Sequence, residues 1–437
     1  MKKVREGYKM TELGEIPSEW EIKSIGEIFD FSGGLSISRA KLTDKGVNYL
    51  HYGDIHMRNE NYINTDKDEV WLPKIEDNFG EIKENVKLNS GDVVFADASE
   101  DYEGIGKSVA IFNDFEKPFV AGLHTIVAKD INNQLENNYK RYCFSTNEVR
   151  KQFRYLATGT SVYGISRENI KKIKINIPTI KEQEKIASIL STVDEQIDNV
   201  DALIEKNKEL KKGLMQTLLT KGIGHTKFKK TEIGEIPEEW TLVKIGDVAK
   251  FQAGYAFKSS DYVDNGVKLV KITNVQQKDL LWNDTDFLPE EFLNKYKEYS
   301  LEINDVIIAM TRPIISSGIK ICKVKKEDTP ALLNQRVGRF ITSENVNNKY
   351  LYQYCFSNYF INKVNELCST TGQPNISSNQ LESIMISLPS TEEQEKIGSI
   401  LLNVDEKMEE YENKKQRLEE LKKGLMQQLL TGNIRII

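Results

Sequence analysis

The chain has 437 residues, a net charge of −6 at neutral pH, and a composition that is 39% apolar and 29% charged. This length suits two to four compact domains of about 100–200 residues, and no apolar run approaches the roughly 18–20 residues that span a bilayer. The lysine-bearing N-terminus lacks the apolar core of a signal peptide, and four scattered cysteines without a CxxC pair exclude a disulfide framework, so we expect a cytoplasmic protein with no membrane contact.

Taken in chain order, the first distinctive element is a polar segment, TELGEIPSEW, at Thr11–Trp20. It returns as TEIGEIPEEW at Thr231–Trp240, with eight of ten positions identical. Two more segments recur in the same order, EQEKIASILSTVDE from Glu182 and LKKGLMQTLLT from Leu210, with eleven of fourteen and ten of eleven positions identical. A repeat this strict predicts that the chain contains two copies of one structural unit.

The regions between the repeated segments diverge in sequence but keep a common pattern. GDVVFAD (91–97) and NDVIIAM (304–310) are short apolar runs after a turn signal, whereas KIKINIP (172–178) and SIMISLP (383–389) are alternating strands that end at proline. The stretch 350–367 has a helical period. We therefore predict an α+β fold in which each diverged region is a twisted sheet with a few packed helices.

Each diverged region is followed by a predicted helix of roughly 38 residues, about 57 Å long at 1.5 Å per residue, that begins after Pro178 or Pro389. One apolar stripe recurs every seven residues, so each helix needs a partner, and the other copy is the nearest candidate. Asn207 takes the stripe position that Leu418 holds in the second copy; it either fixes the register of the pair or lies at the solvated surface. The predicted organisation is a domain over 1–180, a helix over 181–220, a domain over 221–390 and a helix over 391–437.

The candidate enzyme motifs do not fit their surroundings. GIGKS at Gly104–Ser108 resembles the end of a phosphate-binding loop, but position 101, where that loop needs glycine, is Asp101, so a hairpin turn is the better interpretation. His51 and His56 lack the cysteine or carboxylate pattern of a metal site. Methyl-donor, dinucleotide and serine-nucleophile motifs are missing. We predict no catalytic, cofactor-binding or metal-binding residues, and hence a protein that is not an enzyme.

Basic residues gather in one stretch of each diverged region. Positions 139–174 hold nine Lys or Arg against two acids, and positions 310–326 hold five against none. Basic residues interleaved with aromatic and small polar ones are typical of phosphate and base contact, although an ordinary solvated helix face has the same composition. The overall negative charge argues against a nucleic-acid binder only if it is evenly spread.

A polar loop occupies the same place in both diverged regions, TGTSVYGIS at 158–166 and TGQPNISSN at 371–379. Both follow an amphipathic helix and lead into a strand. Divergent polar tips in equivalent places favour two different readouts, because amide side chains pair with adenine and other base edges. Two plain turns are the alternative.

The GEIPxEW entries, the EQEKIxSIL helix starts and the KKGLMQxLLT helix ends together resemble a type I restriction–modification specificity subunit over essentially the whole chain. The resemblance implies that each diverged region is a target-recognition domain for one half of a split DNA sequence, and that the helices pair as an antiparallel coiled coil between them. It also implies a non-catalytic subunit that binds double-stranded DNA and two adenine-N6 methyltransferase subunits and, through these, the restriction subunits. S-adenosylmethionine, ATP and Mg²⁺ would belong to those partners.

The family's recognition residues form no fixed motif, so the candidates rest on chemistry and position. The residues expected to contact DNA are Arg150, Lys151, Arg154, Thr160, Ser161, Tyr163, Arg312, Gln335, Arg336, Gln373, Asn375 and Asn379. The residues expected to contact a methyltransferase subunit are Glu15, Trp20, Glu235, Trp240, Lys185 and Lys396.

Two alternatives from other functional classes stay open at this point. One is a fused DNA methyltransferase, against which the missing methyl-donor motif argues. The other is a coiled-coil scaffold that binds two proteins without a role on DNA. Binding to random duplex at several salt concentrations would distinguish the scaffold, because contacts to phosphates are salt-sensitive.

Overall fold

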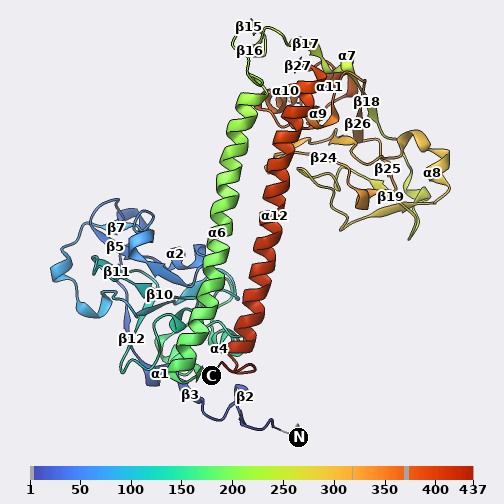
Figure 1. Ribbon diagram of the computed structural model, residues 1–437. Helices are drawn as coiled ribbons and strands as arrows, with labels where there is room; N and C mark the ends of the chain where they lie inside the picture. Colours follow the sequence, from blue (N-terminus) through green and yellow to red (C-terminus); the bar gives the residue numbers. More distant parts are fainter. Residues whose placement is uncertain (1–3, 317, 369–373, 437) are drawn as a thin grey trace. The chain divides into compact units, whose positions relative to one another are not determined.

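The computed structural model describes residues 4–316, 318–368 and 374–436, and its chain divides into two compact units. The first unit comprises residues 1–200 and 414–437, and the second comprises residues 201–413. Two 39-residue helices, α6 (Ile180–Leu218) and α12 (Thr391–Leu429), each contribute to both units (Figure 1). Each unit therefore combines one diverged region with parts of both repeated helices.

The first unit is built on a five-stranded sheet of order β4-β12-β8-β10-β6. In its central strand, Val93 and Phe95 face the cluster that includes the long helices, whereas Val94 and Ala96 face a second cluster on the opposite side. This is why the strand reads as a continuous apolar run. The strands are β4 (Phe29–Gly33), β12 (Thr125–Asp130), β8 (Val93–Ala96), β10 (Ser108–Phe112) and β6 (Tyr62–Asn64).

Smaller elements complete the first unit. A three-stranded sheet of order β11-β5-β7 and three two-stranded pairs, β1-β2, β13-β9 and β14-β3, accompany the main sheet. The bounds are β1 (Tyr8–Thr11), β2 (Gly14–Pro17), β3 (Glu21–Ser24), α1 (Ile25–Ile28), β5 (Val47–Leu50), α2 (Tyr52–Met57), α3 (Thr65–Asp68), β7 (Lys74–Ile75), β9 (Ala98–Ser99), β11 (Phe119–Ala121), α4 (Asn147–Leu156), β13 (Tyr163–Gly164), α5 (Arg167–Ile170) and β14 (Lys174–Ile177).

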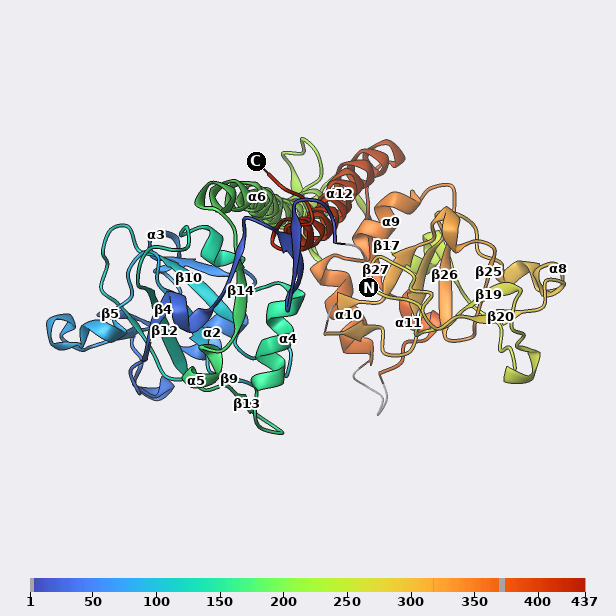
Figure 2. The same ribbon diagram turned by 90° about the horizontal axis from the view of Figure 1, so that it is seen from below.

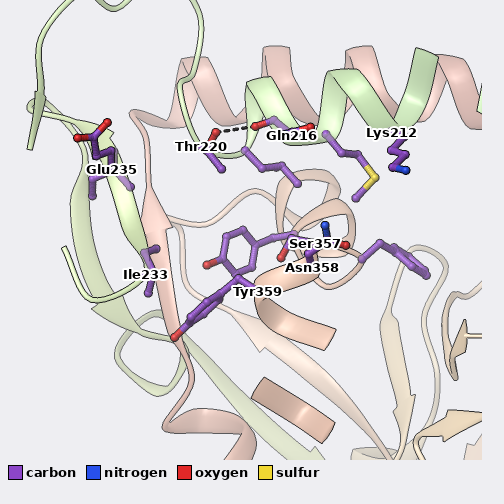
Figure 3. A pocket seen from close by; sticks show the side chains of 13 residues that line it. Lys212, Gln216, Thr220, Ile233, Glu235, Ser357, Asn358 and Tyr359 are labelled. Atoms are coloured by element: carbon purple, nitrogen blue, oxygen red, sulfur yellow. Dashed lines mark hydrogen bonds between the residues drawn. The ribbon is translucent and has the colours of Figure 1, made fainter. Parts of the chain in front are cut away.

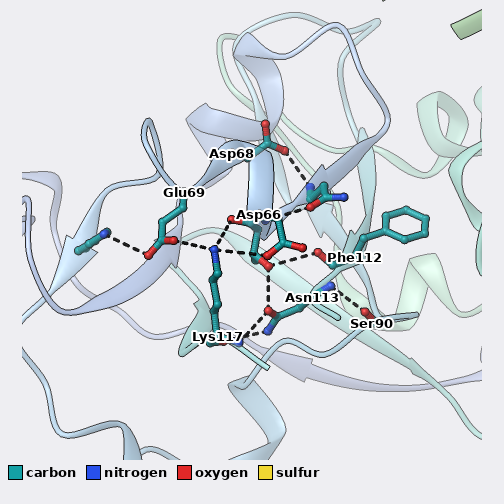
Figure 4. Close-up of polar contacts among 10 residues, drawn as sticks. Asp66, Asp68, Glu69, Ser90, Phe112, Asn113 and Lys117 are labelled. Atoms are coloured by element: carbon teal, nitrogen blue, oxygen red, sulfur yellow. Dashed lines mark hydrogen bonds and ion pairs between the residues drawn. The ribbon is translucent and has the colours of Figure 1, made fainter. Parts of the chain in front are cut away.

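Polar contacts fix α3 against the connection that follows β10 (Figure 4). Asn113 Oδ1 accepts from the Thr65 hydroxyl at 2.8 Å, and its amide donates to the Lys117 carbonyl at 2.8 Å. The Lys117 ammonium pairs with Glu69 at 2.8 Å and Asp66 at 3.3 Å. These contacts satisfy a buried asparagine and tie α3 to the connection that follows β10.

The second unit repeats this plan with a four-stranded sheet of order β18-β26-β21-β24 and a three-stranded sheet of order β20-β19-β25. The central strand β21 again divides its side chains between two clusters, with Val306 and Ile308 on one side and Ile307 and Ala309 on the other. The bounds are β15 (Phe228–Thr231), β16 (Gly234–Pro237), β17 (Thr241–Lys244), α7 (Ile245–Val248), β18 (Ala249–Ala253), β19 (Val267–Val270), β20 (Asp286–Leu288), α8 (Phe292–Lys295), β21 (Val306–Ala309), β22 (Ile314–Ile315), β23 (Gly318–Ile319), β24 (Ile321–Lys323), β25 (Ala331–Leu333), β26 (Val337–Thr342), α9 (Asn348–Tyr354), α10 (Asn358–Cys368), α11 (Ser378–Glu382) and β27 (Met385–Leu388).

The two long helices run side by side and antiparallel (Figures 1 and 2). In the first unit, Lys422 of α12 pairs with Asp194 of α6 at 2.6 Å. In the second unit, Lys211 of α6 pairs with Asp405 of α12 at 2.5 Å. Both lysines come from the repeated KKGLMQ segment and both aspartates from the repeated VDE segment. The internal repeat therefore makes the same ion pair twice, once in each unit.

The structure confirms the α+β fold and the long helix pair, and it decides two smaller expectations. GIGKS lies in a turn that leads into strand β10. A phosphate-binding loop leads into a helix instead, so the expected turn is confirmed. The Asn207 amide donates to the Leu203 carbonyl of its own helix at 2.7 Å. Asn207 is half-buried, and among the described residues no hydrogen bond from it to α12 fixes the register.

Candidate nucleic-acid interface

The polar loop of the first unit is held by a short strand pair. Tyr163 and Gly164 of β13 pair with Ser99 and Ala98 of β9, and the Ile165 N–H donates to the Asp97 carbonyl at 2.8 Å. The strands β9 and β13 lie together at one end of the unit (Figure 2). The tip of the loop, residues 160–162, is exposed. The loop therefore presents small polar side chains on a fixed base.

The structure distinguishes among the predicted residues of the first unit. Thr160 and Ser161 are exposed at the loop tip, and Lys151 is exposed on α4. Arg154 pairs with Glu103 at 2.5 Å. Tyr163 is half-buried, and its ring lies 5.1 Å from that of Tyr102, a residue that sequence reasoning missed because it lies outside the basic stretch.

Arg150 has a different environment. Its guanidinium donates to the backbone carbonyls of Glu103 and Ile105 at 2.6 Å and of Gly106 at 3.2 Å. Burial lowers the pKa of this guanidinium to about 10, which leaves it charged at neutral pH. Arg150 thus holds the GIGKS turn in place from inside the unit.

We expect the substitution Arg150→Met to lower the free energy of unfolding by about 1.5–3 kcal/mol, because hydrogen bonds from a charged donor are lost while the side-chain stem is kept. Urea unfolding would measure this loss. Lys151→Met, on the same helix but exposed, is the matched control and should change stability by less than about 0.5 kcal/mol. Equal effects of the two substitutions would contradict the structural role of Arg150.

Several basic residues of the stretch 139–174 form ion pairs within the unit. Lys140 is 2% exposed and pairs with Asp130 at 3.2 Å, Arg141 pairs with Asp194 at 2.7 Å, and Lys174 pairs with Glu12 at 2.7 Å. All these carboxylates lie outside the stretch in sequence. The local excess of positive charge is therefore only partly a surface property.

A cluster that sequence reasoning missed lies beside the loop of the first unit. His124 Nδ1 is 3.1 Å from an Asp97 carboxylate oxygen. Its ring meets the Tyr52 ring edge-on at 5.3 Å, and His51 and His56 also lie against Tyr52. Three of the four histidines therefore gather around one tyrosine, although they are spread over 74 positions of the sequence.

In the second unit, three predicted residues are brought together at the ends of two central strands. Arg312, exposed and with a positive φ of 46°, donates its N–H to the Pro374 carbonyl at 2.7 Å. Thr311 forms a bridge with Asn375. Arg336 is exposed and accepts from the Met310 N–H at 2.8 Å through its carbonyl.

The other predicted residues of the second unit fall into three different situations. Gln335 is exposed beside Arg336. Asn379 is exposed but belongs to helix α11, which begins at Ser378, so it is not part of the loop as the sequence suggested. Gln373 lies outside the described residues.

The predicted partner-contacting tryptophans are 1% exposed and make the same bond in each unit. Trp20 Nε1 donates to Glu182 at 3.0 Å, and Trp240 Nε1 donates to Glu393 at 3.0 Å. Each glutamate opens a repeated EQEKI segment. The tryptophans are thus conserved between the two copies for packing inside the unit, and their indoles present no exposed face to a partner.

A basic residue closes each of these pairs from the segment that follows a long helix. Arg435 pairs with Glu182 at 2.6 Å and with Glu19 at 2.7 Å. His225 contacts Glu393 at 3.0 Å and Glu239 at 3.4 Å. The end of each long helix is therefore tied to the GEIPxEW entry of the unit it completes.

The remaining partner candidates have accessible side chains. Lys185, Lys396 and Glu235 are exposed, and Glu15 is half-buried beside Arg5, with which it forms an ion pair at 2.9 Å. These residues lie on or next to the repeated segments.

A cavity of about 180 Å³ lies in the second unit between the C-terminal part of α6, strand β16 and the junction of α9 and α10 (Figure 3). Its lining includes the apolar side chains of Met215, Leu219 and Ile233, with Glu235 and Lys212 also at the cavity. Most of these residues belong to the repeated segments. The cavity is thus lined mainly by segments whose sequence is repeated in the other copy.

Within residues 4–316, 318–368 and 374–436, no group of three or more His, Cys, Asp or Glu side chains is arranged to hold a metal ion. The helices of the same ranges include none that is long and apolar enough to cross a membrane.

Comparison with known proteins identifies the repeated unit. A family model described as the type I restriction modification DNA specificity domain matches twice, over residues 17–210 and 237–422. The chain is 41% identical to the type I restriction enzyme MjaVIII specificity subunit of Methanocaldococcus jannaschii over 68% of this chain and 70% of that protein. It is 30% identical to the putative MjaX specificity subunit of the same organism over 99% and 97% of the two chains. The crystal structure of a type I restriction–modification S subunit from M. genitalium has the same fold, with a TM-score of 0.62 at 16% identity over 98% of both chains.

Proposed function

Because the chain belongs to the family of type I restriction enzyme DNA specificity subunits, we propose that it reads a split DNA sequence, one half with each unit. The observation that carries this proposal is the pair of non-repeated polar loops that stand in equivalent places on repeated scaffolds. In both units the residue after the central strand, Asp97 or Met310, bonds through its carbonyl to the loop. Through its N–H it bonds to the residue just before the neighbouring strand of the sheet, β12 or β26. Different tips on the same scaffold support a site with two different halves.

The surfaces that the two copies share differ from those that diverge, and we assign them to different partners. The loops and strand ends differ between the copies, as a DNA-reading surface of an asymmetric site requires. The exposed residues on the repeated segments, Lys185, Lys396 and Glu235, recur or lie next to recurring residues, as two identical methyltransferase subunits would require. We expect those subunits to bind S-adenosylmethionine, and the restriction subunits to bind ATP and Mg²⁺, while this chain performs no catalysis.

The half-sites should lie about one helical turn of DNA apart, as for other two-module readers. The deciding experiment combines the chain with a methyltransferase subunit of a type I restriction–modification system and maps methylated adenines on plasmid DNA. We expect methylation at one bipartite, non-palindromic sequence. Methylation by the isolated chain would instead support a fused enzyme, and a palindromic site would contradict the two-reader proposal.

Binding to duplex DNA should weaken steeply with salt. Each phosphate contact contributes a slope of about −0.9 in a plot of log affinity against log salt concentration. Fluorescence anisotropy of the chain with its methyltransferase, measured at several salt concentrations, would give this slope. A salt-insensitive or absent signal would favour a protein-binding scaffold.

A further inference from the structure

Equivalent backbone hydrogen bonds in the two units show that His124 of the first unit corresponds to Arg336 of the second. In the first unit, Asp97 follows β8, and its N–H donates to the carbonyl of His124 at 3.1 Å. In the second, Met310 follows β21, and its N–H donates to the carbonyl of Arg336 at 2.8 Å. His124 and Arg336 each immediately precede the strand that pairs with that central strand, β12 or β26.

The same two positions also lie next to the polar loops. The Ile165 N–H donates to the Asp97 carbonyl at 2.8 Å, and the Ile376 N–H donates to the Met310 carbonyl at 2.9 Å. His124 and Arg336 are thus equivalent in the scaffold, because each bonds to the residue that also bonds to the loop that we propose reads DNA. Both side chains reach solvent, since that of His124 is 51% exposed and Arg336 is exposed.

The backbone around His124 is held in place. His124 has a φ of 55°, in the left-handed region that His adopts more readily than most residues but that is uncommon for any residue with a Cβ. The preceding Leu123 N–H donates to the Tyr49 hydroxyl at 2.7 Å, and the Thr125 hydroxyl donates to the Gly122 carbonyl at 2.6 Å. An uncommon backbone conformation maintained by surrounding bonds, under an exposed side chain, is a feature of functional sites.

The side-chain chemistry of His124 is set by Asp97. A carboxylate oxygen accepts hydrogen bonds, so this contact favours the tautomer in which Nδ1 donates to Asp97, and in that tautomer Nε2 is an acceptor. Tyr52 packs edge-on against the ring. In the DNA major groove, the donors that such an acceptor can meet are the exocyclic amino groups of adenine and cytosine.

We propose that His124 is a base-contacting residue of the first unit, the counterpart of Arg336 in the second, and that its Nε2 accepts a hydrogen bond from the amino group of an adenine or a cytosine. Asp97 is the positioning residue that fixes this tautomer. Arg336, which can only donate, suits the acceptors of guanine. This inference rests on the proposed function.

The test selects bound sequences from a randomised DNA duplex library with the complex of this chain and its methyltransferase. The variants His124→Asn and His124→Gly both tolerate the left-handed backbone, so a loss of binding would not reflect misfolding, and unchanged thermal unfolding would check this. We expect each to weaken binding to the wild-type site roughly ten- to hundredfold and to relax one position of one half-site.

Three further variants make the outcome specific. His124→Arg should change the preference at that position from adenine or cytosine to guanine, and Asp97→Asn, whose amide can donate to Nδ1, should also admit guanine there because it releases the tautomer. Arg336→Gln should change only the other half-site. Unchanged selection with His124→Gly and His124→Arg would overturn the inference alone, whereas a wild-type complex that enriches no sequence would overturn the proposed function and the inference with it.

Discussion

The substitution Asp405→Ala is expected to lower the free energy of unfolding of the second unit by about 3–5 kcal/mol, the usual cost of leaving a buried charge without its partner. The Asp405 carboxylate accepts from the ammonium groups of Lys211 and Lys278 at 2.5 and 2.7 Å and from the Gln353 amide at 2.8 Å. These donors come from α6, from the loop before β20 and from α9. Removing one carboxylate therefore leaves two cations and an amide unpaired near the helix pair.

Urea unfolding of the full chain would measure the loss, with Glu406→Ala as the control, because Glu406 is the exposed neighbour on the same helix and should change stability by less than about 0.5 kcal/mol. Burial by itself raises the pKa of Asp405, but the two lysines outweigh this effect and lower the pKa below its usual value of 3.8. The stabilisation from the ionised Asp405 is therefore fully present at pH values above the pKa of the unfolded chain, and it is lost as the pH falls through the pKa of the folded chain. The Asp405→Ala chain should lack this acid-dependent component. A loss of less than about 1 kcal/mol would show that the cluster does not hold the unit together.

The elements that the sequence predicted correctly are those whose burial follows from a local pattern, either a continuous apolar run or a seven-residue stripe. Val93–Ala96 and Val306–Ala309 are apolar at every position because they lie between two clusters, and the long helices follow from their seven-residue stripe. The internal repeat predicted the two-unit organisation, because the residues that are identical in both copies are those that the shared fold needs.

Which of the predicted site residues are exposed and unpaired could not be predicted from their sequence neighbours. Lys140 and Arg141 count toward a basic stretch, yet their carboxylate partners, Asp130 and Asp194, lie outside it. Charge counted along a segment cannot include partners that only the fold brings close. Trp20 is a predicted partner contact because it lies in the repeated GEIPxEW entry, whereas its burial against Glu182 depends on a contact over 162 positions.

His124 could not be identified as a candidate site residue from the sequence for a related reason. Asp97 and His124 are 27 positions apart, whereas Met310 and Arg336 are 26 apart, and the connections between them differ in sequence. Only the strand registers of β12 and β26 show that the two residues are equivalent. A single sequence contains no signal that aligns them.

Removing one heptad from each long helix should shorten the spacer between the half-sites by about three base pairs. Residues 199–205 of α6 and 411–417 of α12 lie between the Asp194–Lys422 and Lys211–Asp405 ion pairs along each helix, so both pairs remain available after the deletion. Seven residues at 1.5 Å correspond to about 10 Å, and one base pair to about 3.4 Å. A whole heptad also preserves the apolar stripe.

The effect on the original site should be large, because the shortened chain cannot engage both halves at the old spacing and keeps only weaker binding. Specific sites are usually bound about a thousandfold or more tighter than non-specific DNA, so methylation of the wild-type sequence should fall by a comparable factor. Mapping methylated adenines would then reveal the same two half-sites with a shorter spacer. Duplicating the two heptads is the matched control and should lengthen the spacer by about three base pairs. If both variants kept the wild-type spacer, the helices would not set the distance between the half-sites.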